Sequence, residues 1–103
     1  MAKKVKAYTA RNAQELAALL DLDPADAIEM EFRAKLNKKI IDAVKAQGLT
    51  HVEVSKLAKA SRTRITAILN GNTSGISSDL LLRVLYSLGY KAKVSFTHAK
   101  IAA

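Results

Sequence analysis

The order of apolar and polar residues along the chain predicts a helical protein built around one long helix. From Ile28 to Val44 an apolar residue recurs at every fourth position, with charged residues between, which is typical of an amphipathic helix. Asp23 and Pro24 predict the N-cap and first residue of this helix, because proline lacks an N–H that would have no partner there. Gly48 predicts its end, since glycine tolerates the left-handed conformation that follows a helix.

Two short helices separated by a tight turn are predicted immediately after the long one. Thr50 and Glu53 form a capping-box pattern that opens the first of them. Ser61 predicts the N-cap of the second, which Asn70 and Gly71 end. The apolar positions of the pair are expected to be buried: Val54, Leu57, Ala58, Ile65, Ile68 and Leu69.

Two further helices complete a predicted bundle of five. Asn12, with a glutamate three residues later, opens a short apolar helix that ends near Asp21. Ser77 or Ser78 starts the last helix, which is rich in leucine and ends at Gly89.

The segment after the last helix has the alternation of a β-strand. In Tyr90–Phe96 apolar residues alternate with lysine and serine, so one face is expected to be buried. Because a single strand is not stable alone, it needs a partner. The candidates are Lys4–Tyr8, in the same chain or a second one, and the same segment of a second copy across a two-fold axis. We therefore expect a homodimer.

The net charge of +8 is unevenly distributed over the 103 residues. Residues 12–32 carry six acidic and no basic residues, whereas residues 33–103 carry 13 basic and three acidic ones. This asymmetry predicts one surface for a polyanion and another for a cationic partner. The alternative is that the acidic residues only cap and solvate the starts of helices.

Composition and spacing argue against several classes of protein. Without cysteine there is no disulfide framework, cysteine-based zinc site or thiol nucleophile. His51 and His98 have no carboxylate at metal-ligand spacing, and Asn70–Gly75 lacks the lysine of a phosphate loop, so no catalytic residue, metal or cofactor is expected. The longest apolar run, Leu80–Leu82, is far shorter than the roughly 20 residues of a membrane span. No signal peptide is evident, which favours a cytoplasmic location without membrane contact.

The second short helix carries the most informative surface of the chain. One side of it holds Arg62, Thr63, Thr66, Ala67 and Asn70. Short side chains let a helix approach base edges, an arginine binds guanine through two hydrogen bonds, and no acidic residue repels phosphate. This side therefore suits the major groove of duplex DNA. Most basic amphipathic helices only face solvent. The prediction of DNA binding therefore depends on the order of the two short helices, their caps and the tight turn more than on any one residue.

Residues around that side are predicted to contact the DNA backbone. They are Thr50, His51, Lys56, Lys59, Arg64 and Asn72. The chain has five aromatic residues and no tryptophan, so stacking on RNA or single strands is a weaker expectation than binding to duplex DNA.

The stretch Gly48–Gly71 resembles the helix-turn-helix of the Cro/lambda-repressor (Xre-type) family, with Gly-Leu-Thr-His at its start and Asn-Gly at its end. The extension Leu80–Val94 looks like the HigA-type antitoxin and phage-associated regulator branch. The resemblance implies an all-α, lambda-repressor-like domain of five helices, with a C-terminal strand used in pairing or dimerisation. It covers residues 26–97, leaving a leader at 1–25 and a tail at 98–103.

Three positions depart from the family pattern. His51, next to Thr50 at the start of the first short helix, replaces a glutamine that often anchors this helix to phosphate, and a neutral imidazole is a weaker contact. Ser55 replaces a small alanine at the helix crossing and keeps the close approach. Lys59 replaces the turn glycine, so we expect a left-handed lysine at a cost of about 1 kcal/mol.

The resemblance also implies a function. The protein would be a repressor that binds a palindromic operator as a homodimer, with the helix Arg62–Asn70 in the major groove. In the antitoxin branch, the acidic segment Asn12–Phe32 is expected to dock a basic ribonuclease toxin. The alternative function is a protein-interaction antitoxin with DNA binding secondary. Structural support of the helix bundle is the plainer explanation for the same segment.

Overall fold

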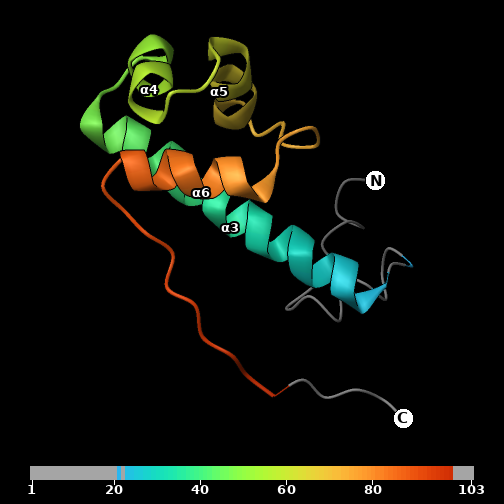
Figure 1. The fold of residues 1–103 in the computed structure, drawn as a ribbon. Coiled ribbons are helices and arrows are strands. Elements are labelled where there is room, and N and C mark those ends of the chain that lie inside the picture. The colour runs from blue at the N-terminus through green and yellow to red at the C-terminus, as the bar shows by residue number, and fades with distance from the viewer. Residues whose placement is uncertain (1–20, 22, 99–103) are drawn as a thin grey trace, which may run out of the picture.

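The computed structural model describes residues 21 and 23–98, and this part of the chain contains four helices and no strand (Figure 1). The helices are α3 (Pro24–Gln47), α4 (His51–Ala58), α5 (Arg62–Leu69) and α6 (Ser78–Ser87). The described residues therefore form an all-α fold, as predicted. The fifth predicted helix, from Asn12 to near Asp21, falls almost entirely outside them.

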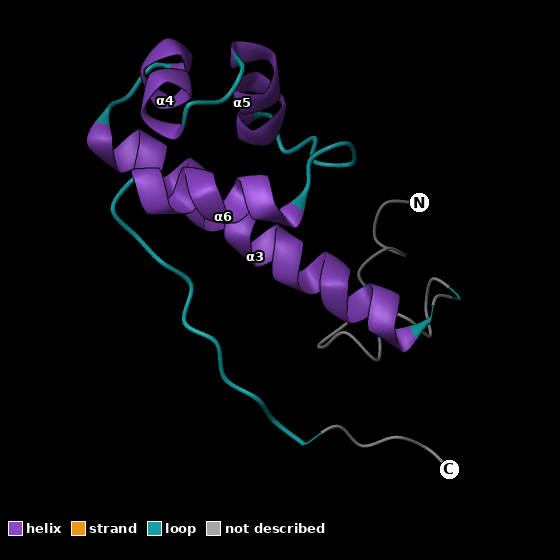
Figure 2. Cartoon of the chain, in the orientation of Figure 1, coloured by secondary structure: helices purple, strands orange, loops and turns teal. Residues whose placement is uncertain are grey.

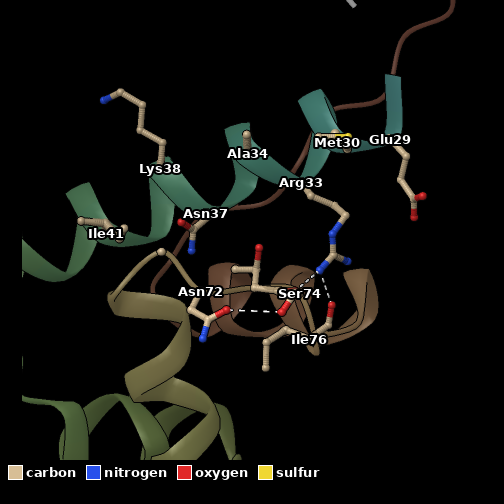
Figure 3. A pocket seen from close by; sticks show the side chains of 12 residues that line it. Glu29, Met30, Arg33, Ala34, Asn37, Lys38, Ile41, Asn72, Ser74 and Ile76 are labelled. Atoms are coloured by element: carbon tan, nitrogen blue, oxygen red, sulfur yellow. Dashed lines mark hydrogen bonds between the residues drawn. The ribbon is translucent and has the colours of Figure 1, made fainter. Parts of the chain in front are cut away.

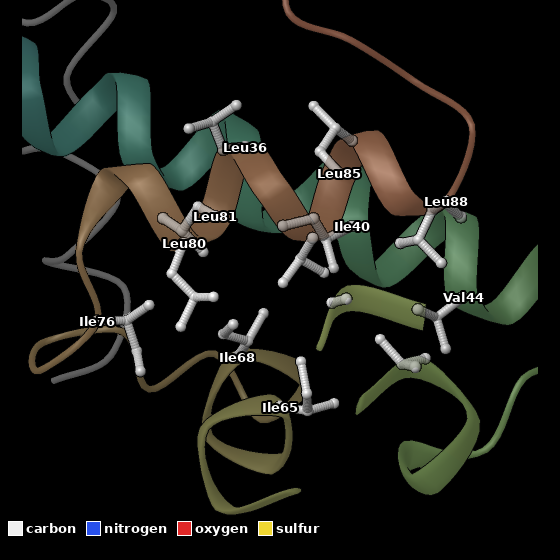
Figure 4. Packing of buried hydrophobic residues seen from close by; sticks show 14 residues of the cluster. Leu36, Ile40, Val44, Ile65, Ile68, Ile76, Leu80, Leu81, Leu85 and Leu88 are labelled. Atoms are coloured by element: carbon white, nitrogen blue, oxygen red, sulfur yellow. The ribbon is translucent and has the colours of Figure 1, made fainter. Parts of the chain in front are cut away.

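The four helices form two layers with the apolar core between them. α6 lies along the C-terminal half of α3, and the short helices α4 and α5 cover the other side of the core (Figure 1). Apolar side chains of both layers meet in the centre, where Ile40, Leu81, Ile65 and Ile68 are fully buried (Figure 4). The N-terminal half of α3 extends beyond α6 and the core (Figure 1).

Each helix begins at a residue whose side chain caps it, at the predicted positions. The Asp23 carboxylate accepts a backbone N–H of the first turn of α3 at 2.8 Å. Thr50 and Glu53 form the predicted capping box of α4. The hydroxyls of Ser61 and Ser77 cap α5 and α6 in the same way, so Ser77 is the N-cap of the two serines considered.

A residue with positive φ follows each of the four helices where the sequence predicts its end, and Gly89 has this role after α6. Gly48 follows α3 with φ 65°, and Gly71 follows α5 with φ 79°. Lys59 follows α4 with φ 55°, which confirms the predicted left-handed lysine. These sharp ends let α4 pack on α5 and α6, and α5 pack on α3.

Several apolar residues that were expected to be buried are not. In the row along α3, Leu36 and Val44 are buried, but Ile28 and Phe32 are 50% and 42% exposed. Since four residues turn a helix by about 400°, the row rotates by about 40° at each step and leaves the core face. Leu57 is 50% exposed, and the α4 side chains that reach the core are Val54 and Ala58.

The predicted strand at Tyr90–Phe96 does not form within the described residues (Figure 2). The N–H of Tyr90 still bonds to the last turn of α6, and its ring centroid lies 4.3 Å from the Lys39 Nζ. Phe96, at the far end, is 93% exposed. A strand needs a neighbouring strand, and the neighbour considered within one chain, Lys4–Tyr8, lies outside the described residues.

Between residues 23 and 98, every helix is too short or too polar to cross a lipid bilayer.

Candidate nucleic-acid interface

α4 and α5 are short helices joined by a tight turn, and their packing decides which side of α5 faces outward. Ile65 and Ile68 of α5 are fully buried against the other layer (Figure 4). The helical repeat places Thr63 and Asn70 on the opposite side, and both are exposed. The core therefore leaves Thr63 and Asn70 of the predicted side uncovered, while Ala67 on the same side packs partly against the core.

The other predicted contact residues lie on this side or at its edges. Arg62 and Arg64 flank it at the first turn of α5, and both are exposed. Thr66 and Ala67 lie on it and are half-buried. The predicted backbone contacts that surround it are also exposed: Thr50, Lys56, Lys59 and Asn72.

His51 joins α4 directly to the outward side of α5. Its Nδ1 lies 3.0 Å from the Thr66 Oγ1, within hydrogen-bond distance, and the imidazole is half-buried. The sequence predicted His51 as a weak phosphate contact and Thr66 as a separate base contact. In the folded domain the two side chains are instead in contact, and they link the start of α4 to the outward side of α5.

Thr50 has a structural role beside the interface. Its hydroxyl accepts the N–H of Glu53 at 3.1 Å, and its own N–H donates to the Glu53 Oε1 at 2.8 Å. A hydroxyl that accepts a hydrogen bond still has a proton to donate. Thr50 can therefore hold the start of α4 and donate to a phosphate oxygen at once.

The electrostatics of this region favour a polyanion. Between Thr50 and Asn72 there are four basic residues and one acidic residue, Glu53, whose carboxylate is held by the capping box. Arg62 and Arg64 form no ion pair with another described residue, so their charges are available to a ligand. Basic side chains that form no ion pair with neighbouring acidic side chains are typical of nucleic-acid interfaces.

The turn after α5 is tightly built from backbone hydrogen bonds. The N–H of Gly71 donates to the carbonyl of Ile68, and the N–H of Asn72 donates to the carbonyl of Ala67 at 2.8 Å. The Asn72 side chain then accepts a hydrogen bond from the Ser74 hydroxyl at 3.3 Å. Asn72 therefore has a defined position relative to the end of α5.

Two α3 residues that sequence reasoning missed hold this end of the interface (Figure 3). The Asn37 side-chain amide donates to the carbonyl of Ile68 at 2.8 Å. Arg33, one helical turn earlier, donates to the carbonyls of Thr73 and Ile76. The only signal in the sequence is that two polar residues, four positions apart, flank the buried stripe of α3.

Few of the acidic residues at the start of α3 have an identified partner among the described residues. Asp23 caps the helix and Asp26 lies in its first turn, as expected for residues that stabilise a helix start. Within the described part of the chain, no group of three or more histidine, cysteine or carboxylate side chains is placed to hold a metal ion.

Two short helices joined by a tight turn, the second with an outward polar side free of acidic residues, define a helix-turn-helix DNA-binding domain. Comparison with known families agrees, and the chain belongs to the helix-turn-helix domain family, whose model matches residues 18–97. No curated protein and no solved structure matches the chain.

Proposed function

We propose that this protein is a sequence-specific regulator of transcription, a repressor of the lambda-repressor (Xre) type in the HigA-like branch. The observation that carries the proposal is the division of α5 into two sides. Its apolar side is buried in the core at Ile65 and Ile68, and its polar side faces outward and has no acidic residue. A helix of this kind has the width and chemistry to enter a major groove.

The proposed contacts follow from the position of each side chain on α5. Arg62 binds a guanine through two hydrogen bonds, while Thr63 and Asn70 contact neighbouring base edges. Thr66 and Ala67 are small enough for the helix to approach closely. The residues at the edges of α5 bind phosphates and set the register on the duplex; they are Thr50, His51, Lys56, Lys59, Arg64 and Asn72.

We further propose that the protein acts as a homodimer and represses by occupying promoter DNA. Tyr90–Phe96 has no strand partner in the described chain and exposes apolar side chains, so the same segment of a second copy is a suitable partner. Two copies related by a two-fold axis would present two α5 helices about 34–36 Å apart, one in each of two successive major grooves.

Selection of bound sequences from a pool of random duplexes tests DNA binding, half-site spacing and symmetry together. We expect an inverted repeat whose half-sites are about 10–10.5 base pairs apart. Enrichment of a single unrepeated site would exclude the symmetric dimer. Failure to enrich any duplex, or preference for single strands in a gel shift, would exclude the proposed function.

A second candidate function is that of an antitoxin. The acidic segment of residues 12–32 contrasts with the basic helix-turn-helix, and such a segment suits the phosphate-binding surface of a basic ribonuclease toxin. In the narrower form of this candidate, toxin neutralisation is the main activity and DNA binding is secondary. Co-purification of a toxin encoded by an adjacent gene should then be lost on deletion of residues 1–23, and its survival would exclude the acidic segment as the docking site.

A further inference from the structure

The segment between α5 and α6, residues 71–77, is held in place by one side chain from a distant part of the chain. Arg33 of α3 donates through one guanidinium nitrogen to the Ser78 hydroxyl at 3.1 Å. Through the other it donates to the carbonyls of Thr73 and Ile76, and Figure 3 shows Arg33 beside Ile76. The planar fork of arginine can satisfy several acceptors at once, which the single ammonium of lysine does less well. Arg33 thus joins the middle and the C-terminal part of this segment to the first residue of α6.

The same contacts decide which polar groups of the 71–77 segment face outward. The carbonyl of Thr73 accepts hydrogen bonds from both Arg33 and the N–H of Ile76, so it is directed inward. Asn72 and Ser74 are exposed and line the open groove between α3 and this segment (Figure 3), where the Asn72 amide nitrogen is available to donate. Carbonyl oxygens repel phosphate and polar donors attract it, so this orientation suits the segment to lie against a DNA backbone.

The segment is continuous with the end of α5, which α3 also holds. Asn37 lies one turn after Arg33 and donates to the carbonyl of Ile68 in the last turn of α5. One face of α3 therefore fixes both the end of α5 and the residues that follow it, although α3 lies outside the helix-turn-helix.

We propose that Arg33 is a positioning residue for DNA binding, because it orients the 71–77 segment so that the Asn72 side-chain amide donates to a phosphate, while the Ser74 hydroxyl holds the Asn72 side chain in place. The inference rests on the proposed function and extends the interface to a residue that does not itself touch DNA. Loss of the Arg33 fork removes the guanidinium partner of the Ile76 carbonyl and leaves the Thr73 carbonyl with the N–H of Ile76 alone, which frees the segment to turn carbonyls toward the duplex.

The experiment compares Arg33→Met with Lys35→Met, which removes the same charge from an exposed position two residues away. Affinity is measured by fluorescence anisotropy on a selected duplex and on a random duplex, at a temperature where circular dichroism shows each variant folded. We expect Arg33→Met to bind both duplexes about tenfold more weakly than Lys35→Met does, the equivalent of roughly one lost phosphate contact. Amide hydrogen exchange should accelerate in residues 73–76 and not in α4.

Arg33→Lys keeps the charge without the fork and is the milder variant if Arg33→Met does not fold. We expect it to bind more weakly than the wild type, with the same loosening of residues 73–76. Wild-type affinity in folded Arg33→Lys, or equal affinities of Arg33→Met and Lys35→Met, would overturn the positioning role while leaving DNA binding intact. If the wild-type protein binds neither duplex, the proposed function fails and this inference fails with it.

Discussion

The Nδ1 of His51 lies 3.0 Å from the Oγ1 of Thr66, and this contact joins the first residue of α4 to the outward side of α5. The two residues are 15 positions apart in the chain, so the contact depends on how the helices cross. It fixes the position of the Thr66 side chain before any DNA is bound. An interface whose side chains are already oriented loses less conformational entropy on binding.

We expect His51 and Thr66 to be energetically coupled. His51→Ala and Thr66→Val should each lower the free energy of unfolding, and the double variant should lose about 1 kcal/mol less than the two single losses added together. Urea denaturation at neutral pH measures all four proteins of this cycle. Additive losses would mean that the hydrogen bond contributes nothing to the folded domain.

Arg62 and Lys56 should affect DNA binding in different ways. Arg62→Ala is expected to cost about 1–3 kcal/mol of binding energy and to relax sequence preference, because it removes a base contact. Lys56→Ala should weaken binding to all duplexes alike and reduce the salt slope by about one, because it removes a phosphate contact. Titrations of a selected and a random duplex at several salt concentrations separate the two effects. Equal losses of specificity would mean that α5 meets DNA by a different side.

Replacement of the left-handed Lys59 should stabilise the domain. With φ at 55°, Lys59→Gly is expected to raise the free energy of unfolding by about 1 kcal/mol, since glycine has no Cβ to clash in this conformation. Lys59→Ala removes the same charge but keeps the Cβ, so it serves as the matched control. Thermal unfolding should show a higher midpoint for the glycine variant than for the alanine variant, and equal midpoints would contradict the assignment of strain to this residue.

The exposed C-terminal segment should determine the oligomeric state. The wild type is expected to sediment at twice the chain mass of 11.1 kDa at micromolar concentration. Replacement of Val94 and Phe96, which are 70% and 93% exposed, by serine should shift the population to monomer without unfolding the helices. Replacement of the exposed Tyr86 of α6 by serine is the control for a general loss of surface apolar area. A monomeric wild type would exclude pairing through this segment.

Asp42 provides a test of the surface electrostatics of α3. A hydrogen bond from the Lys38 ammonium at 2.8 Å, together with the nearby charges of Lys38, Lys45 and Lys39, holds the pKa of the Asp42 carboxyl below its ordinary value. A lowered pKa in the folded state means that this pair stabilises the domain above the ordinary pKa, and that the contribution is lost as pH falls through the lowered value.

An NMR titration of the Asp42 carboxyl measures this shift directly. We expect Lys38→Met to return the pKa of Asp42 toward its ordinary value, and Lys35→Met, which has no such contact, to leave it nearly unchanged. The shift should also shrink at high salt, because both side chains of the pair are largely exposed. A pKa that does not respond to Lys38→Met would mean that the ion pair is not populated in solution.

The ends of the helices could be predicted because each depends on only a few neighbouring residues. A cap side chain at Asp23 or Ser61 bonds to backbone two or three residues ahead, whatever the rest of the fold does. The left-handed Lys59 was predictable only through the resemblance, since Lys59 stands where the helix-turn-helix family has its turn glycine. The outward side of α5 could also be predicted. The spacing of Ile65 and Ile68 identifies the buried side of the helix, and the outward side lies opposite to it.

The positions of Arg33 and Asn37 could not be predicted, because their partners lie 31 to 45 residues away. The same limit applies to burial. Ile28 and Leu36 belong to one apolar row, yet only Leu36 is covered by another helix.

The sequence by itself thus determined where the helices begin and end and which side of α5 is polar, since those properties arise from hydrogen bonds and periodicity within a few turns. Tertiary structure alone decided that His51 meets Thr66, that α3 holds the residues after α5, and that Tyr90–Phe96 forms no strand with another of the described residues. The physical reason is that such contacts form between segments far apart in the chain. Which surfaces of those segments pack together is not specified by a local pattern of residues.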